Sequence, residues 1–158
     1  MKALISGTFD PVTVGHLDVI RRAAAMFDEV YAVVFNNTEK SCLFDLDTRR
    51  AMLEAACEGL ANVTVDVCDG LLAAYTEEHD IGVIVRGVRD ASDVPYEMML
   101  STINRGLRNH PDTVFIPSKP AYFHISSSYV RNMLKYGEKL EEIVPEGAIE
   151  ILKKAMDG

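Results

Sequence analysis

The sequence alternates between two hydrophobic patterns. Five short runs are apolar at most positions and rich in β-branched residues, as is typical of strands covered on both faces. Between and after these runs, apolar residues recur every three or four positions, which indicates amphipathic helices. The predicted strands span residues 2–6, 30–35, 62–67, 83–87 and 113–117. The predicted helices span residues 15–27, 45–60, 71–78, 93–108, 126–136 and 146–156.

Local signals support several helix ends. Asp45 is a suitable N-cap, Gly137 can end the fifth helix, and Pro145 suits the start of the sixth. In the helix predicted over residues 93–108, an apolar face is formed by Tyr96, Leu100, Ile103 and Leu107. Strands separated by helices predict an α/β fold with a five-stranded parallel sheet and helices on both faces.

Composition limits the possible functions. The 158 residues suit one domain, so we expect residues 1–158 to share a single core. A formal net charge of −8 argues against broad nucleic-acid binding, although it permits a small polyanionic ligand in a cleft. The first residues are too short an apolar run for a signal peptide or membrane span, which predicts a cytoplasmic protein without a membrane partner.

The metal-binding and redox residues show no familiar spacing. The 3 cysteines include no C-x-x-C pair, and the 4 histidines form no H-E-x-x-H motif. We therefore expect neither a disulfide framework nor a metal site built only from protein ligands. Motifs of P-loop enzymes, of dinucleotide-binding dehydrogenases and of serine hydrolases are also absent.

Polar donors follow the predicted strands. In a parallel sheet the carboxyl ends of the strands meet at one edge, where ligands bind. The donors expected at this edge are Thr8, His16, Lys40, Arg86, Arg89, Lys119 and the serines 126–128. Helix starts near His16 and Ser126 would add free amide groups. This combination predicts a phosphate-rich ligand, although each feature alone also fits a turn, a helix cap or a surface ion pair.

Two motifs make the sequence recognisable. The stretch GTFDPVTVGH, residues 7–16, resembles the first signature of the nucleotidyltransferases, and ISSS, residues 125–128, resembles the second. Within that superfamily the chain resembles the bacterial phosphopantetheine adenylyltransferases. The specific marks are Lys40 with Leu43-Phe44, the block RGVRDASDVPYE at residues 86–97, and the pair Asn104-Arg105.

This resemblance implies an activity. The family transfers AMP from ATP to 4′-phosphopantetheine, forming dephospho-coenzyme A and pyrophosphate with Mg²⁺. It also implies a dinucleotide-binding-like (Rossmann-like) fold and a homohexamer, and makes coenzyme A a candidate feedback ligand.

Site residues are implied residue by residue. His16 and Lys40 would be catalytic. The ATP-binding residues would be Thr8, Phe9, His16, Gly87, Val88, Arg89, Glu97, Tyr122, Phe123, His124, Ile125, Ser126, Ser127 and Ser128. The phosphopantetheine-binding residues would be Thr8, Lys40, Leu72 and Arg86. Two positions depart from the common pattern, because His124 stands where an aromatic residue is usual and Arg131 where lysine is common.

The expected mechanism needs no covalent intermediate. A substrate phosphate is an adequate nucleophile, so the protein must align two anions and stabilise charge at the α-phosphate of ATP. We expect His16 to donate a hydrogen bond and Lys40 to supply a cation. Gly7 and Gly15 would make room for the triphosphate, and Thr8 would lie between the substrates.

Other functions stay open at this point. The chain could act on nicotinamide mononucleotide, or on glycerol phosphate as a cytidylyltransferase. It could also be a non-catalytic nucleotide-binding sensor or a flavodoxin-like electron carrier.

Overall fold

A computed structural model describes residues 1–36, 39, 41–106 and 109–158. The strands are β1 (Lys2–Gly7), β2 (Glu29–Phe35), β3 (Val63–Cys68), β4 (Val83–Val88) and β5 (Asp112–Pro117). The α-helices are α1 (Val14–Met26), α2 (Leu46–Ala56), α3 (Leu72–Glu78), α4 (Val94–Arg105), α5 (Ser127–Lys135) and α6 (Glu146–Asp157). A short 3₁₀ helix, η1 (Pro120–Tyr122), precedes α5. Each predicted strand and helix is therefore present, with ends that differ by a few residues.

The strands form one parallel sheet in the order β3-β2-β1-β4-β5. The chain proceeds outward from β1 to β3 and then returns to place β4 on the other side of β1. Between β1 and β4 the direction of progression reverses, and such a switch point leaves a crevice beyond the carboxyl ends of the strands. The predicted fold class is confirmed, and the topology marks where a ligand site belongs.

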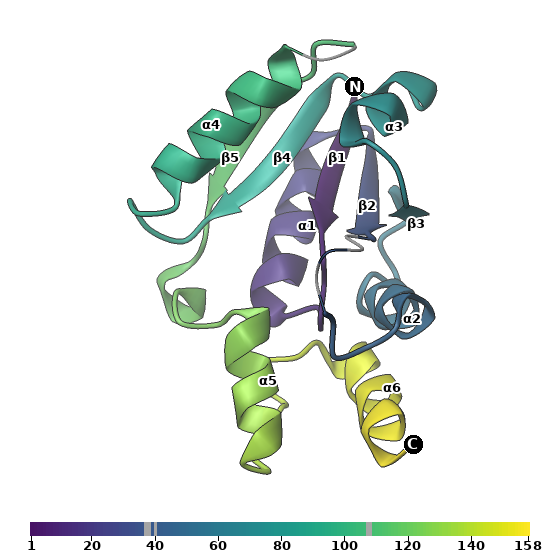
Figure 1. Cartoon of the computed structure of the whole chain (residues 1–158), viewed down its shortest axis with the longest axis vertical. Helices are drawn as coiled ribbons and strands as arrows, with labels where there is room; N and C mark the ends of the chain where they lie inside the picture. Colours follow the sequence, from purple (N-terminus) through teal and green to yellow (C-terminus); the bar gives the residue numbers. More distant parts are fainter. Residues whose placement is uncertain (37–38, 40, 107–108) are drawn as a thin grey trace.

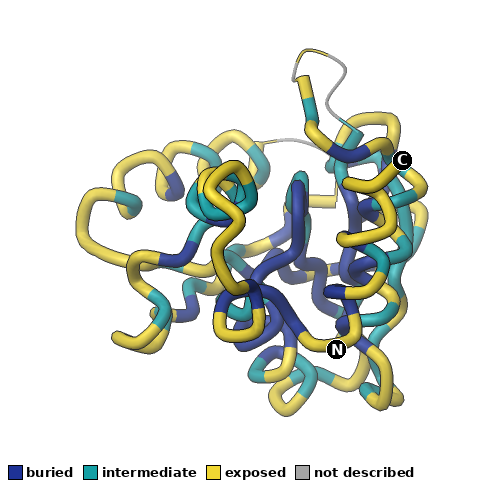
Figure 2. Tube along the Cα trace, turned by 90° about the horizontal axis from the view of Figure 1, so that it is seen from below, coloured by how far each residue is buried: buried dark blue, intermediate teal, exposed yellow. Residues whose placement is uncertain are grey.

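Helices cover both faces of the sheet (Figure 1). On one face, Ile20 of α1 and Leu53 of α2 pack with Ile5 of β1 in the larger apolar cluster. On the other, Tyr75 of α3 packs with Leu4 of β1. Figure 2 shows buried residues concentrated in the centre of the molecule, with exposed segments around them. The strands are therefore apolar on both sides because both sides are covered.

Side-chain caps fix the starts of α2 and α5. The Asp45 carboxylate accepts a hydrogen bond from the backbone N–H of Thr48 at 2.7 Å, which confirms the predicted N-cap of α2. Ser126 does the same for Tyr129 at the start of α5, at 3.0 Å. Among the helices that the structure describes, none has the length and apolar character needed to cross a membrane.

Helix α4 differs from the expectation. Of the four residues aligned by the sequence pattern, Tyr96 and Ile103 are 59% and 51% exposed, and Leu107 lies outside the described residues. The buried residue of this helix is the charged Glu97. The apolar pattern of α4 thus predicted a helix correctly, but much of its apolar surface faces away from the core of this chain.

Candidate active site

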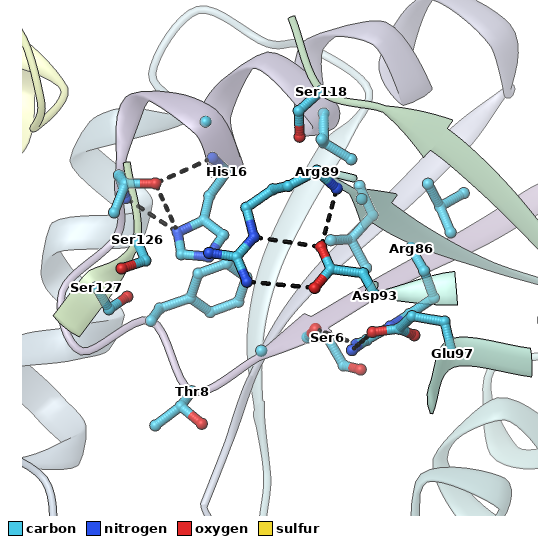
Figure 3. A pocket seen from close by; sticks show the side chains of 18 of the residues that line it. Ser6, Thr8, His16, Arg86, Arg89, Asp93, Glu97, Ser118, Ser126 and Ser127 are labelled. Carbon is cyan, nitrogen blue, oxygen red and sulfur yellow. Dashed lines mark hydrogen bonds and ion pairs between the residues drawn. The ribbon is translucent and has the colours of Figure 1, made fainter. Parts of the chain in front are cut away.

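A cavity of about 580 Å³ lies at the switch point, beyond the carboxyl ends of β1 and β4 (Figure 3). Its volume is in the range of small-molecule sites in proteins. One side is bounded by polar groups near the end of β4 and the start of α5, including Arg89, Ser118 and Ser126. The other side extends to apolar residues, including Phe35 and Leu72. Thr8 and His16 also line the cavity, so a polar region and an apolar region share one space.

The turn after β1 is held by Phe9. Its side chain is 2% exposed, and its backbone has a φ of 49°, an uncommon conformation for a residue with a side chain. The ring lies edge-on to the His16 ring, with centroids 5.0 Å apart. A Cβ on Gly7 would lie 3.1 Å from the Phe9 ring, tighter than most real contacts. Gly7, expected to make room for a triphosphate, therefore makes room for Phe9 in this structure.

His16 is oriented by the helix cap that precedes it. Thr13 is the N-cap of α1, and its hydroxyl accepts the backbone N–H of His16 at 3.2 Å. In return, the backbone N–H of Thr13 donates to Nδ1 of His16 at 3.0 Å. Since Nδ1 accepts this bond, the proton of the neutral imidazole is on Nε2. His16 thus has a fixed tautomer with one N–H donor.

The surroundings keep this imidazole neutral. Burial lowers the pKa of His16 to about 4, and the positive charges of Arg86 and Arg89 contribute in the same direction. A histidine with this pKa carries no charge near neutral pH. It can donate a hydrogen bond from Nε2 but does not act as an imidazolium.

Two arginines, one in the last part of β4 and one just after it, are paired with two carboxylates, those of the α4 N-cap Asp93 and of Glu97 in the first turn of α4. Arg86 donates from Nε and Nη2 to both oxygens of Glu97, at 2.7 and 2.9 Å, and from Nη1 to the carbonyl of Ser6 at 3.1 Å. Of its five N–H donors, this leaves one on each terminal nitrogen without a partner among the described residues. These remaining N–H groups can donate to the oxygens of a phosphate.

Arg89 is held by Asp93 in a similar way. Its Nε and Nη2 donate to the Asp93 carboxylate at 3.3 and 3.4 Å, and its backbone N–H donates to the same group at 3.0 Å. Asp93 and Glu97 are four residues apart and therefore lie on one face of α4. Helix α4 consequently positions both arginines while offsetting part of their charge.

A second cavity of about 390 Å³ adjoins the first. It is reached past residues that line both cavities: Thr8, Phe9, His16 and Ser127. Its other walls include Ser128 and Arg131 of α5. The Ser127 hydroxyl donates to the carbonyl of Pro11 at 2.8 Å, and Nη1 of Arg131 donates to the carbonyl of Asp10 at 2.7 Å. These bonds fasten the first turns of α5, with their free amide groups, to the turn after β1.

The predicted site residues do not all reach these cavities. Those that line at least one are Thr8, Phe9, His16, Leu72, Arg86, Gly87, Arg89, Glu97, Tyr122, Ile125, Ser126, Ser127 and Ser128. Val88, Phe123 and His124 line neither, and the carbonyl of Val88 accepts the N–H of Ser118 at 2.8 Å. Lys40 lies outside the described residues.

The cation expected from Lys119 lies elsewhere. Its Nζ is 2.6 Å from Oδ1 of Asp18, a carboxylate of α1. Lys119 lines neither cavity, so the expected cluster of cations is smaller than the sequence suggested. The cause is a buried acid on a neighbouring helix, which no local pattern pairs with this lysine.

Several lining residues were not assigned to the site from the sequence. They include Ser6, Phe35, Asp93, Tyr96, Leu100, Asn104 and Ser118. Asp93 could have been found, because it follows Arg89 by four residues, a spacing that suits an ion pair at a helix start. The apolar members carry no chemical signal and become visible only once the sheet and α4 are placed.

Three comparisons with known proteins bear on the family and the fold. Residues 4–133 match the model of the cytidylyltransferase-like family. Over 159 aligned residues, the chain is 38% identical to the phosphopantetheine adenylyltransferase of Thermotoga neapolitana, covering 100% of this chain and 99% of the relative. A crystal structure described as a putative nicotinate-nucleotide adenylyltransferase from Vibrio parahaemolyticus has the same fold, with a TM-score of 0.72, 20% identity, and coverage of 97% of this chain and 91% of that one. The chain therefore belongs to the cytidylyltransferase-like nucleotidyltransferases and, within them, to the phosphopantetheine adenylyltransferase family.

Proposed function

We propose that this protein transfers AMP from ATP to 4′-phosphopantetheine, releasing pyrophosphate and dephospho-coenzyme A. The observation that carries the proposal is the continuous cavity with a polar side, an apolar side, and Thr8 and His16 lining it. Such a cavity fits two substrates whose reacting phosphates meet near these residues. The name of the relative from Thermotoga neapolitana supports the same acceptor.

On the ATP side, the adenosine would lie against the end of β4 and the segment before α5. The triphosphate would extend to the start of α5, where amide groups and the serine hydroxyls suit negative charge. The adjoining cavity with Arg131 offers space for the departing pyrophosphate. The backbone of Val88 and the exposed side chains of Phe123 and His124 remain predicted ATP contacts.

On the acceptor side, Arg86 would bind the phosphate of 4′-phosphopantetheine through the N–H donors that remain on its two terminal nitrogens. Glu97 holds the guanidinium in one orientation, which reduces the freedom lost on binding. Leu72 and its apolar neighbours would receive the pantetheine arm. Lys40 remains a predicted second cation for the same phosphate.

The chemical step would be a direct displacement. An oxygen of the acceptor phosphate attacks the α-phosphorus of ATP, and the bond from that phosphorus to the bridging oxygen of pyrophosphate breaks. The acceptor phosphate needs no general base, because it is already largely ionised near neutral pH. Neutral His16 would donate its Nε2 hydrogen to an α-phosphate oxygen as charge develops there. The protein thus aligns the reactants and stabilises charge.

Magnesium would enter as part of the MgATP substrate. Among the described residues there is no group of three or more histidine, cysteine or acidic side chains suited to hold a metal. The acids that line the first cavity, Asp93 and Glu97, are already paired with arginines. These facts fit an ion held by phosphate oxygens and water, as Mg²⁺ commonly is.

A self-association proposal follows from α4. Its exposed Tyr96, Met98, Met99 and Ile103 form an apolar surface on an element that lines the cavity. We propose that copies of this chain cover this surface, in the homohexamer expected from the family resemblance. A cytoplasmic location remains an expectation from the sequence, and coenzyme A remains a candidate feedback ligand from the family resemblance.

The test is an assay of the purified chain with MgATP and three separate acceptors. We expect dephospho-coenzyme A and pyrophosphate in equal amounts with 4′-phosphopantetheine. Faster pyrophosphate release with nicotinamide mononucleotide, or with glycerol phosphate and CTP, would assign one of those reactions instead. ATP binding without turnover on any acceptor would favour a non-catalytic sensor.

A further inference from the structure

Arg49 of α2 is a buried cation directly behind the turn after β1. The residue is 3% exposed. Its Nη1 donates to the carbonyl of Thr8 at 3.0 Å, and its Nε donates to the carbonyl of Phe44 at 3.1 Å. One planar guanidinium therefore joins the peptide of Thr8, which lines both cavities, to the segment leading into α2.

Arg49 has no ion-pair partner among the described residues, which is unusual for a buried charge. No carboxylate among the described residues lies within 4.0 Å of its guanidinium nitrogens. Burying a charge without an ionic partner is costly, and an apolar side chain of similar volume would serve packing alone. The cost is consistent with a role that requires two donors at a fixed separation.

Asp10 binds the backbone N–H groups of the same segment. Its carboxylate, 4% exposed as a residue, accepts the backbone N–H groups of Leu43 and Phe44 at 2.8 and 2.9 Å. The peptide groups of Phe44 are thus bound by Asp10 at the nitrogen and by Arg49 at the oxygen. Leu43 and Phe44 follow Lys40 in the chain by only three and four residues.

We propose that Arg49 is a positioning residue for the acceptor side of the active site. It fixes the Thr8 peptide relative to Phe44 in the segment that leads into α2, so that Thr8 keeps its place at the cavity. This inference rests on the proposed function, because it takes Thr8 as a contact of 4′-phosphopantetheine. It adds that a residue of α2 without access to the substrates sets their alignment.

The inference predicts different effects on the two substrates. The polar side of the cavity is held by other contacts, including Arg89 with Asp93 and the cap of α5. Thr8 is one of fourteen predicted ATP contacts but one of only four predicted acceptor contacts. Loss of Arg49 should therefore weaken acceptor use and turnover much more than ATP binding. A general loosening of the fold would instead affect both substrates together.

The test compares Arg49→Met with Arg50→Met. Arg50 is the next residue of α2, exposed and paired with Glu54 at 2.8 Å, so it is a matched control for the same substitution. Because a small misplacement of reacting groups costs up to about 100-fold, we expect Arg49→Met to lower kcat about tenfold or more. The KM for 4′-phosphopantetheine should rise by about tenfold, while the Kd for ATP alone changes less than about threefold. Arg50→Met should match the wild type.

Conservative variants keep the test decisive if Arg49→Met does not fold. Lysine retains the charge but cannot hold both carbonyls with a rigid fork. Arg49→Lys should show the same separation of the two substrates, smaller in size, with Arg50→Lys as its control. Equal kinetics of the Arg49 and Arg50 variants, or equal losses for ATP and acceptor, would overturn the inference. A wild-type chain that forms no dephospho-coenzyme A would instead overturn the proposed function and, with it, this role.

Discussion

Lowering the pH from about 7.5 to about 5 tests the environment assigned to His16. With a pKa of about 4, His16 is about 10% protonated at the lower pH, whereas an unperturbed histidine would be about 97% protonated. The tautomer is also fixed, because Nδ1 accepts the backbone N–H of Thr13. We expect ¹⁵N NMR of labelled protein to show a neutral His16 with its proton on Nε2 throughout this range. The His16→Asn variant identifies the resonance by its loss.

The same shift affects stability with a definite sign. Between pH 4 and 6.5 the unfolded chain takes up a proton at His16 that the folded chain does not, so stability falls as the pH falls. From about pH 7.5 to about pH 5 this amounts to about 2 kcal/mol of unfolding free energy. Urea denaturation should show that loss in the wild type beyond the loss in His16→Asn. A titration midpoint of His16 near 6.5, a proton on Nδ1, or equal pH dependence of the two proteins would refute the reasoning.

Three further substitutions address the chemistry and the fold, and a fourth addresses assembly. His16→Ala should lower kcat by about 10²–10³ with a smaller effect on the Kd for ATP, and unchanged turnover would remove His16 from the chemistry. Arg86→Ala should mainly raise the KM for 4′-phosphopantetheine in steady-state assays, whereas a loss confined to ATP affinity would reverse the assignment of the two sides. Gly7→Ala should cost about 1–3 kcal/mol in thermal or urea unfolding, since its Cβ would press on the Phe9 ring, and an unchanged unfolding free energy would contradict that contact. Ile103→Lys should reduce the assembly measured by light scattering if the apolar surface of α4 is an interface, and an unchanged mass would exclude that surface.

Much of the fold is accessible from the sequence for a physical reason. Strands buried on both faces are apolar throughout, so β1 and β4 stand out from the helices between them. In a parallel sheet the strand ends meet at one edge, and this rule alone predicts that Thr8, His16 and Arg86 lie close together. Helix caps such as Asp45 depend only on neighbouring residues and are equally predictable.

The remaining features depend on three-dimensional neighbours. The periodicity of α4 identifies an apolar face but not what covers it, so the exposure of Tyr96 and Ile103 was not foreseen. Ion pairing is likewise non-local, which is why Lys119 was expected at the site although it pairs with Asp18. Arg49 carries no motif, and only its contact with the Thr8 carbonyl links it to the site.

The central claim is that one cavity brings the phosphate of 4′-phosphopantetheine to the α-phosphate of ATP beside His16. The most direct measurement follows the products of the wild type and His16→Ala by mass spectrometry, with MgATP and 4′-phosphopantetheine as substrates. The account predicts dephospho-coenzyme A and pyrophosphate in equal amounts, formed about 10²–10³ times more slowly by the variant. Absence of dephospho-coenzyme A from the wild-type reaction, while ATP still binds, would contradict it.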